Sequence, residues 1–488
     1  MVGPPAVRSS RTSVRRVVGA AIAALCVVTG CSGGGSDASA TAADQSGAQA
    51  LALVTPVLSG RRAPDLLAQR SAQLALSSGL EQVLAQAPPD TCLVVTTDAG
   101  VLFARNGDLP LTPASTTKLL TAAVAMEVLG PDHRFATEVR SPVGAIDGVL
   151  NADIHLVGGG DPLLTTSGYA ASLPDPLVRL TSPLEQLADA TVAAGITRVA
   201  GSVVGDGSRY DDAVGVASWP ASYRLGSTVG SLGALRVNAG REGWADDPAA
   251  VTNGGNAGDP TQLAAQTFTQ LLRARGVTVD GEPGVGPAPA MAPKVAGMLS
   301  PPLAEMMDEL LAWSDNGAAE LLVKELGLVV SGQPTTAAGT NVVATTVASW
   351  GFATDAISIV DGSGLDTGNR LTCSLLAGLV SRPASDSPVL DGLARPGSAG
   401  TLWGRLTDSS APGRVRAKTG TLNTVRSLTG DVASATEGAL RFAFIANGPA
   451  SAPGLSHDIA DAVVRLLLDH PRGPDAADLA PLPPTPLA

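Results

Sequence analysis

The chain has 488 residues, more than one ordinary domain holds, so we expect two or three domains. Its 44 acidic residues outnumber the 32 lysines and arginines, and the net charge of -12 argues against nucleic acid as a partner. With 56 glycines and 36 prolines but no collagen-like period, the composition is that of a loop-rich globular protein.

Lysine is rare in this chain. It occurs at Lys118, Lys294, Lys324 and Lys418, and all other basic residues are arginine. Biased genomic base composition explains that preference, and under such a bias lysine should persist where arginine cannot replace it. A general base is one such place, because arginine cannot be deprotonated in a protein.

The first 31 residues predict an export signal. Several arginines precede an apolar run over 17–28, which is too short for a stable membrane span. The segment Val28-Thr29-Gly30-Cys31 resembles a bacterial lipobox, which predicts that Cys31 becomes the lipidated first residue of the mature chain. An ordinary signal peptide with an incidental cysteine is the alternative.

A stretch rich in Ser, Gly and Ala follows, and we interpret residues 32–60 as a flexible linker. Such a tether favours the lipoprotein hypothesis, because a lipid anchor needs no membrane-spanning helix. Cys92 and Cys373 would remain in the processed chain outside the reducing cytosol. Two alternatives are open for them: a disulfide, or two buried free thiols.

A helix predicted from about residue 64 and a hairpin over 92–104 lead to the first candidate catalytic motif, Ser115-x-x-Lys118. On a helix this spacing places both side chains on one face, where a neutral lysine can take the serine proton. The first turn of a helix also depresses a lysine pKa. By itself the pattern equally fits a Ser/Thr-rich helix start with a solvated lysine.

The sequence between 141 and 291 predicts an inserted domain, or two small ones. Short apolar runs separated by Gly, Pro and Asp are compatible with strands at 135–139, 153–157 and 199–204. Helices are expected over 184–194 and 261–275. The glycine-rich segment 158–162 lacks the lysine and the following Ser or Thr of a phosphate loop, so we interpret it as a turn.

A second polar motif, Ser314-Asp315-Asn316, separates a helix predicted over 302–312 from another over 317–326. All three residue types are also favoured as helix N-caps, which is the alternative interpretation. A third motif, Lys418-Thr419-Gly420, lies on the first of three predicted antiparallel strands, at 416–422, 425–432 and 440–446. A helix over 459–468 and a Pro-rich tail, 471–488, predicted to be disordered, end the chain.

These three motifs, in this order, resemble those of penicillin-binding proteins and class A β-lactamases. The long insertion between the first two motifs resembles the D-Ala-D-Ala carboxypeptidase/endopeptidase family called penicillin-binding protein 4, the S13 peptidases. Further stretches are similar to signatures of that family, at 156–162, 205–211, 361–365, 397–402 and 427–430. The resemblance covers roughly residues 64–468, nearly all of the processed chain.

The resemblance implies an α/β, multi-domain α+β fold. Its β-lactamase/transpeptidase-like core, an antiparallel sheet flanked by helices, would be interrupted between the first and second motifs by a large inserted domain. The expected limits are 1–31 for the signal, 32–60 for the linker, 61–140 and 292–470 for the two parts of the core, 141–291 for the insertion and 471–488 for the tail.

Ser115 is expected to attack the carbonyl of a terminal D-Ala-D-Ala bond after Lys118 has taken its proton. A nearby cation should keep Lys118 neutral, and Lys418 is the obvious one. Ser314 can relay a proton to the leaving amine, and Asn316 can hold Lys118 and the substrate amide. Water would then hydrolyse the acyl-enzyme.

The family points to the backbone N–H groups of Ser115 and Thr421 as oxyanion donors, which typically contribute about 3–4 kcal/mol each. Lys418 and Thr419, with Thr421, are expected to bind the terminal carboxylate, and Gly420 belongs to the same oxyanion and substrate-binding set. The expected partners are peptidoglycan stem peptides, and β-lactam antibiotics should trap the same serine. No metal or cofactor is expected. The four histidines lie outside the motifs, which argues against a Ser-His-Asp triad.

One departure from the family concerns the substrate side chain. In members that recognise diaminopimelate, an arginine follows the D-G-S-G-L-S turn and, with an aspartate of the inserted domain, binds the zwitterionic end of that side chain. Asp206 matches the aspartate, but here the turn continues Asp366-Thr367 and the next arginine is Arg370. Side-chain specificity therefore stays open.

The sequence thus predicts a serine D,D-peptidase at the extracytoplasmic face of the membrane or in the cell wall. One alternative is a β-lactamase or esterase on the same core, which the long insertion disfavours. Another is a non-catalytic peptidoglycan-binding envelope protein, which the complete set of motif residues disfavours. The preference for carboxypeptidase or endopeptidase cleavage and the oligomeric state are left open.

Overall fold

The structure is a computed structural model that describes residues 59–173, 179–225, 228–242, 255–382, 387–398, 400–434 and 438–481. The predicted signal, almost all of the predicted linker and the candidate lipidation site Cys31 lie outside the described residues. Within the part that is described, no helix combines the length and the apolar character that crossing a membrane requires.

The first sheet is five-stranded and antiparallel, with the strand order β13-β14-β15-β1-β2. Its strands are β1 (Asp90–Thr97), β2 (Gly100–Arg105), β13 (Val415–Leu422), β14 (Val425–Ala433) and β15 (Ala439–Asn447). The register of β1 against β15 runs from Asp90 opposite Asn447 to Thr96 opposite Arg441. The hairpin that precedes the first motif and the strand of the third motif therefore share one sheet.

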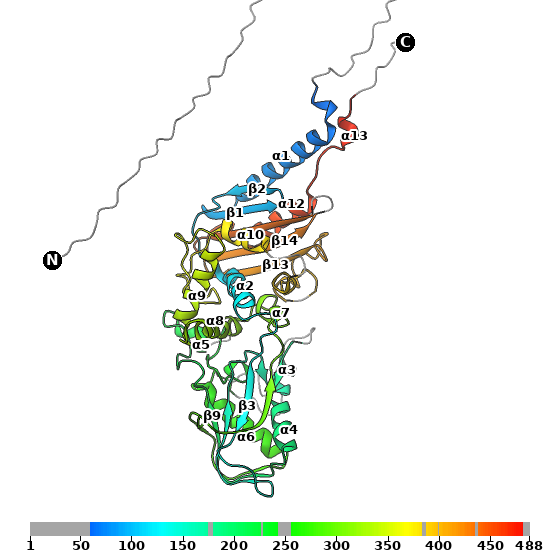
Figure 1. The fold of residues 1–488 in the computed structure, drawn as a ribbon. Coiled ribbons are helices and arrows are strands. Elements are labelled where there is room, and N and C mark those ends of the chain that lie inside the picture. Colours follow the sequence, from blue (N-terminus) through cyan, green and yellow to red (C-terminus); the bar gives the residue numbers. More distant parts are fainter. Residues whose placement is uncertain are drawn as a thin grey trace, which may run out of the picture. The chain divides into compact units, whose positions relative to one another are not determined.

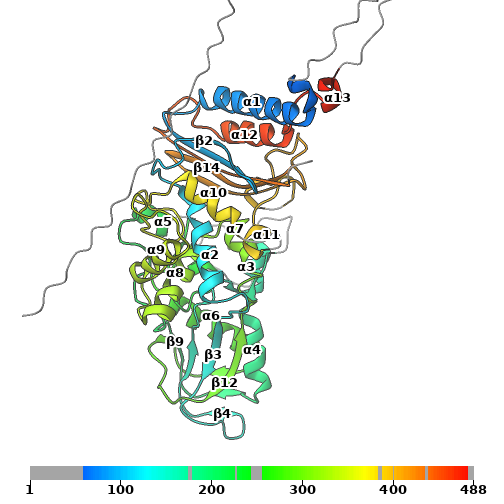
Figure 2. The same cartoon turned by 45° about the horizontal axis from the view of Figure 1, so that its top comes forward.

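Helices cover both faces of this sheet (Figure 2). α1 (Pro64–Leu84) and α12 (His457–Asp469) lie over one face, and α10 (Cys373–Ser381) and α2 (Lys118–Val128) lie on the other. Successive side chains along a strand point to opposite faces, so Phe442 and Phe444 join the core under α1 and α12 while Ala443 and Ile445 join the core around α2. The apolar runs within β1 and β15 follow from burial on both faces.

A helical layer packs against α2 and carries the second motif. It contains α7 (Met307–Leu311), α8 (Asn316–Ser331), α9 (Thr336–Ser349) and α11 (Pro388–Asp391). The Asp315 carboxylate accepts a hydrogen bond of 2.9 Å from the Ala318 N–H and caps α8, which fixes where the helix starts. Gly332 ends α8 in the left-handed conformation, at φ 69°.

The second large sheet belongs to the segment between the first two motifs and has the order β11-β9-β5-β3-β12 (Figure 1). Its strands are β3 (Ala136–Arg140), β5 (Ile154–Val157), β9 (Val203–Asp206), β11 (Gly284–Val285) and β12 (Lys294–Leu299). β3 pairs antiparallel with β5 and β12, whereas β9 pairs parallel with β5 and β11. α4 (Leu184–Ala193) packs on β3 and β12, and α6 (Pro260–Ala274) packs on β9 and β11.

Shorter elements complete this segment. They are α3 (Ser167–Ser172), α5 (Ala221–Leu225), a small sheet of β4 (Val149–Leu150), β8 (Arg198–Val199) and β10 (Thr278–Val279), and the pair β6 (Leu164–Thr165) and β7 (Ser182–Pro183). The predicted helices over 184–194, 261–275, 317–326 and 459–468 are confirmed as α4, α6, α8 and α12. The helix predicted over 302–312 is shorter, because only the five residues of α7 are α-helical.

The expected limits of the insertion, 141–291, differ from the strand pairing. β3 and β12 lie outside those limits, yet both hydrogen-bond into the second sheet rather than the first. The tail differs from the predicted disorder in its described part, because α13 (Ala476–Leu479) packs against α1. Arg61 also donates to the carbonyls of Asp478 and Ala480. Both differences depend on contacts between segments far apart in the chain.

Cys92 and Cys373 form a disulfide, which decides between the two alternatives left open by the sequence. The S–S distance is 2.02 Å and the Cα atoms are 6.0 Å apart. The bond joins β1 to the first residue of α10, across a sequence separation of 281 residues. It ties the central part of the first sheet to the helix that covers it on the side of α2.

Candidate active site

Ser115 and Lys118 lie together at the start of α2. Ser115 belongs to a 3₁₀ turn, Ala114–Thr117, and α2 begins at Lys118, so the predicted helix start is confirmed with a tighter first turn. The Lys118 Nζ is 3.1 Å from the Ser115 Oγ. Ala114 is fully buried at φ 51°, a left-handed conformation that costs free energy for a residue with a Cβ. The backbone is therefore strained immediately before the candidate nucleophile.

The fully buried Lys118 Nζ makes two further contacts. It donates to the Asn316 Oδ1 at 2.7 Å and to the Ser363 carbonyl at 2.8 Å. Burial lowers the Lys118 pKa to about 8, and the opposing effects of Asp361, Glu320 and Asp315 are smaller. A lysine with this pKa is neutral in a useful fraction of molecules near neutral pH.

Lys418 is also fully buried, and its Nζ donates to the Thr419 carbonyl at 2.9 Å. Burial, followed by the charge of Lys118, holds the Lys418 pKa well below its ordinary value. The expectation that the charge of Lys418 is what keeps Lys118 neutral needs correction, because burial is the largest cause for both lysines. The charge of Lys118 disfavours a charge on Lys418, so the buried pair carries at most one charge.

The second motif forms the junction between α7 and α8. Ser314 has φ 61°, so this turn too contains a residue in the left-handed region. Asn316 is the first residue of α8, and its side chain bridges two parts of the chain: Oδ1 accepts from Lys118, and Nδ2 donates to the Thr228 carbonyl at 2.8 Å. Asn316 therefore fixes the Lys118 amine relative to the segment that contains Thr228.

The third motif lies on β13, the strand at the edge of the first sheet, next to the turn that holds Ser115. A Cβ atom at Gly420 would lie 2.8 Å from the Pro113 carbonyl oxygen and 3.1 Å from the Ser115 nitrogen, so only glycine allows this approach. Opposite Gly420, Ser427 on β14 donates to the same carbonyl at 2.6 Å. β13 and the 3₁₀ turn Ala114–Thr117 are therefore held in close contact.

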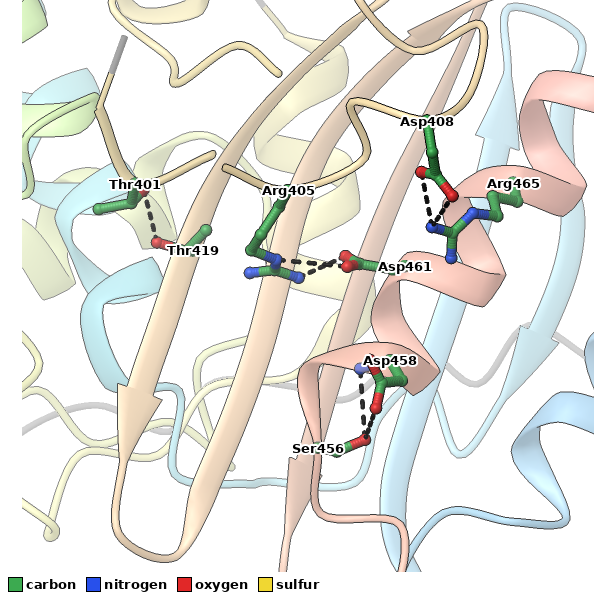
Figure 3. Close-up of polar contacts among 8 residues, drawn as sticks. All are labelled: Thr401, Arg405, Asp408, Thr419, Ser456, Asp458, Asp461 and Arg465. Carbon is green, nitrogen blue, oxygen red and sulfur yellow. Dashed lines mark hydrogen bonds and ion pairs between the residues drawn. The ribbon is translucent and has the colours of Figure 1, made fainter. Parts of the chain in front are cut away.

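The hydroxyl of Thr419 points to Thr401, and their oxygens are 2.8 Å apart (Figure 3). Thr401 belongs to a segment that is anchored a few residues later, where Arg405 pairs with Asp461 on α12. Arg465, also on α12, pairs with Asp408 in the same segment. The Thr419 hydroxyl is therefore oriented by a segment that is itself anchored to α12.

Sequence reasoning did not assign roles to two residues next to Lys118. The Ser363 carbonyl is held toward Lys118 because the Glu320 Oε1 accepts the N–H groups of Gly362 and Ser363, at 3.1 and 2.8 Å. Glu320 is fully buried, and burial together with Asp361 raises its pKa to about 8. Its position four residues after Asn316 on α8 is the signal that could have indicated it, because that spacing shares a helix face.

Asp206 is not placed with the other candidate residues. Its two carboxylate oxygens accept the N–H groups of Ser208 and Ala288, at 2.9 and 2.8 Å. It lines a separate cavity of about 390 Å³ to which Ser115, Lys118, Asn316 and Lys418 do not contribute. The hydrogen bonds give Asp206 a structural task at the end of β9.

Arg370, the first arginine after the 361–365 turn, is also engaged elsewhere. Its Nη1 donates to the Thr112 Oγ1 and to the carbonyls of Thr367 and Asn369. The Asp366 carboxylate accepts the Ser218 hydroxyl and the Gly368 N–H. The arginine–aspartate pair expected for a zwitterionic side chain is therefore not assembled from these residues.

A serine whose hydroxyl meets a buried lysine, with an asparagine on the lysine and a Lys-Thr-Gly edge strand beside the serine, defines the class of serine acyl-enzymes that react with penicillin. The chain matches the D-Ala-D-Ala carboxypeptidase 3 (S13) family over residues 76–241 and 245–469, and it belongs to that family. The family predicted from the sequence is confirmed, and the protein is a serine-type D-Ala-D-Ala carboxypeptidase.

Individual relatives agree with this assignment. The chain is 31% identical over 437 residues to the D-alanyl-D-alanine carboxypeptidase of Actinomadura sp. (strain R39), covering 78% of this chain and 81% of the relative. The crystal structure of penicillin-binding protein 4 from Haemophilus influenzae is similar with a TM-score of 0.67 and 19% identity, over 80% of this chain and 98% of the other. A second structure of that protein, complexed with a β-lactam, gives a TM-score of 0.61 at 18% identity, over 80% and 98% of the two chains. These likenesses confirm the predicted fold class.

Proposed function

We propose that Ser115 is the nucleophile with which this peptidase cuts D-Ala-D-Ala ends, and D-Ala–diamino acid cross-links, in peptidoglycan. The observation that carries the proposal is the contact of 3.1 Å between the Ser115 Oγ and the Nζ of a fully buried lysine. A hydroxyl becomes an effective nucleophile when a base within hydrogen-bond reach takes its proton.

The contacts of Lys118 set the direction of this proton transfer. Two acceptors, the Asn316 Oδ1 and the Ser363 carbonyl, occupy the two N–H bonds of a neutral amine. The nitrogen lone pair is then left for the third neighbour, the Ser115 hydroxyl. Lys118 takes the proton as the Ser115 Oγ bonds to the substrate carbonyl carbon. Ser314 relays a proton to the leaving amine, and water later hydrolyses the ester on Ser115.

The oxyanion of the tetrahedral intermediate is held by the backbone N–H groups of Ser115 and Thr421. The close approach of β13 to the nucleophile turn at Gly420 supports this pairing of donors. Lys418 and Thr419 bind the terminal carboxylate of the substrate, with Thr401 orienting the Thr419 hydroxyl. β-Lactams acylate the same serine, which is supported by the β-lactam complex of the Haemophilus influenzae relative.

The proposal also covers the location of the protein in the cell and the limits of its inserted domain. Residues 1–31 direct export, and lipidation of Cys31 anchors the enzyme by way of the linker over 32–60. The Cys92–Cys373 disulfide supports an oxidising, extracytoplasmic location. The second sheet, from β3 to β12, is the core of an inserted domain that spans about residues 136–299.

Labelling with a fluorescent penicillin tests the nucleophile. We expect one labelled peptide, containing Ser115, and no label on the S115A variant. S410A, which removes an exposed hydroxyl far along the chain, is the matched control and should label normally. Release of D-Ala from a pentapeptide should disappear in parallel with the label. Labelling of S115A, or a labelled peptide without Ser115, would mean that another residue is the nucleophile.

A further inference from the structure

A polar cavity of about 380 Å³ opens beside the second motif. Ser314, Asp315 and Asn316 form one wall, and the inserted segment supplies the opposite wall, which includes the side chains of Tyr169, Arg179, Arg236 and Arg241. The catalytic mechanism above uses the motif residues but none of these four side chains. Of the three guanidinium groups, that of Arg179 is paired with Glu309, whereas that of Arg236 is buried. A buried guanidinium without an ion pair is costly unless an anion enters the cavity.

Arg236 lines this cavity and yet is only 2% exposed, so its guanidinium is almost fully buried. Its Nη2 donates to the carbonyls of Val229 and Ala239, but its Nε has no hydrogen-bond partner in the described parts of the chain. Within those same parts no carboxylate is close enough to Arg236 for an ion pair, and the charge of Asp315 offsets the effect of burial on its pKa only in part. Burial lowers the Arg236 pKa, so the surroundings penalise its charge. A buried, incompletely paired guanidinium is stabilised by an anion that approaches from the cavity.

The two carboxylates of the cavity offset only part of its positive charge. Glu309 is already engaged, since its Oε2 accepts from the Arg179 Nε at 2.5 Å and its Oε1 accepts from the Leu180 N–H. Asp315 uses one carboxylate oxygen to cap α8. The phenol of Tyr169 lies within the electrostatic reach of Arg241, Arg236 and Arg179, and burial raises its pKa. The cavity thus combines guanidinium groups, which are cationic and donate paired hydrogen bonds, with a neutral hydroxyl donor, and this combination suits a carboxylate.

The position of Ser314 indicates which carboxylate enters. In the function proposed above, on which this inference rests, Ser314 passes a proton to the leaving amine, so the cavity lies on the leaving-group side. When the leaving group is a single D-Ala, its one carboxylate is bound by Lys418 and Thr419. When the leaving group is a cross-linked stem peptide, it continues beyond that point and carries further free carboxylates.

We propose that this cavity is a leaving-side subsite that binds a carboxylate of the departing stem peptide through Arg236, Arg241 and Tyr169. The subsite makes the enzyme select cross-linked substrates, so that cleavage of cross-links depends on it and release of D-Ala does not. Arg236 also packs against the first turn of α8 at Gly317, where a Cβ would overlap its guanidinium. An anion bound to Arg236 in the cavity would therefore also affect the position of the turn that holds Asn316.

The test compares two soluble substrates with the same acyl donor: a pentapeptide that releases D-Ala, and a cross-linked peptide dimer. The primary variant is R241Q, because Arg241 is only half-buried and Arg236 packs within the fold. We expect R241Q to lower kcat/KM for the dimer about tenfold relative to the pentapeptide, the loss of one charged hydrogen bond. R198Q, which removes an exposed arginine paired with Asp280, is the matched control and should change neither value.

A second arm uses the dimer in which every free carboxylate of the departing stem is amidated except the one next to the cleaved bond, which Lys418 and Thr419 bind. Wild-type enzyme should lose about the same factor on the amidated dimer, and R241Q should lose little more. The subsite is refuted if R241Q lowers both kcat/KM values equally, if it lowers neither, or if wild-type enzyme cuts the two dimers equally well. Penicillin labelling of Ser115 is followed throughout. Absence of label on wild-type enzyme refutes the proposed function, whereas normal label with no dimer selectivity refutes only the subsite.

Discussion

The rate of acylation should rise with pH through about 8, because the reaction needs Lys118 neutral and burial lowers its pKa to about that value. Below this pH the lysine is protonated and cannot accept the serine proton. With a pKa of about 8, the neutral fraction grows from about 1% at pH 6 to about 90% at pH 9, nearly a hundredfold change. The corresponding change in apparent activation free energy is about 3 kcal/mol.

Stopped-flow mixing with a fluorescent penicillin measures this second-order rate directly, before deacylation contributes. The logarithm of the rate should climb with a slope near one per pH unit and level off above about pH 8. The reasoning is refuted if the rate does not depend on pH, or if it is still climbing toward the ordinary lysine value of 10.5. K118R should not be acylated at any pH, because arginine stays protonated.

A variant of Glu320 tests the direction in which a neighbouring carboxylate shifts the Lys118 pKa. Because the Glu320 pKa is about 8, about half of the Glu320 carboxylates are ionised near the midpoint, and this ionised fraction raises the Lys118 pKa. E320Q should therefore move the midpoint of the profile to lower pH. The glutamine keeps an acceptor oxygen for the Gly362 and Ser363 N–H groups, which preserves the turn. E127Q, an exposed position on the same helix as Lys118, is the matched control and should leave the midpoint unchanged. A shift of E320Q to higher pH would contradict the assignment.

Two further predictions concern the frame around the site. G420A should lose most acylation and about 1–3 kcal/mol of stability, because its Cβ would collide with the Pro113 carbonyl. G404A is the control, because no atom lies within 4 Å of the position of its Cβ, and it should behave as wild type in labelling and in thermal melts. Equal melting of the two variants would be evidence against the close contact. The C92A/C373A variant should unfold at a lower urea concentration, because the loop-entropy model for a separation of 281 residues predicts a loss of up to about 6 kcal/mol in the free energy of unfolding. It should still label at Ser115 under native conditions. An unchanged urea midpoint would show that the disulfide adds no stability.

Much of the site could be predicted from local sequence. Ser115 and Lys118, three residues apart, share a helix face whatever the rest of the chain does, and Asp315 caps the helix that begins at Asn316. The strands around Lys418 were visible as apolar runs separated by turn residues, and the structure places them as β13, β14 and β15. Motif order then indicated the family, which the comparison with known proteins confirmed. Local spacing and side-chain chemistry suffice for such features, because they depend on neighbours along the chain.

Other features were decided only by the tertiary structure. Burial, not a neighbouring charge, sets the pKa of Lys118, and burial is a property of the assembled core. The pairing of Cys92 with Cys373 and the place of β3 and β12 in the second sheet depend on segments far apart in sequence. Asp206 matched a motif, yet its carboxylate is used by nearby N–H groups and lies in another cavity. The Ser115-x-x-Lys118 pattern predicts the reacting atoms, whereas the fold sets the pKa of Lys118 and forms the cavity beside the second motif.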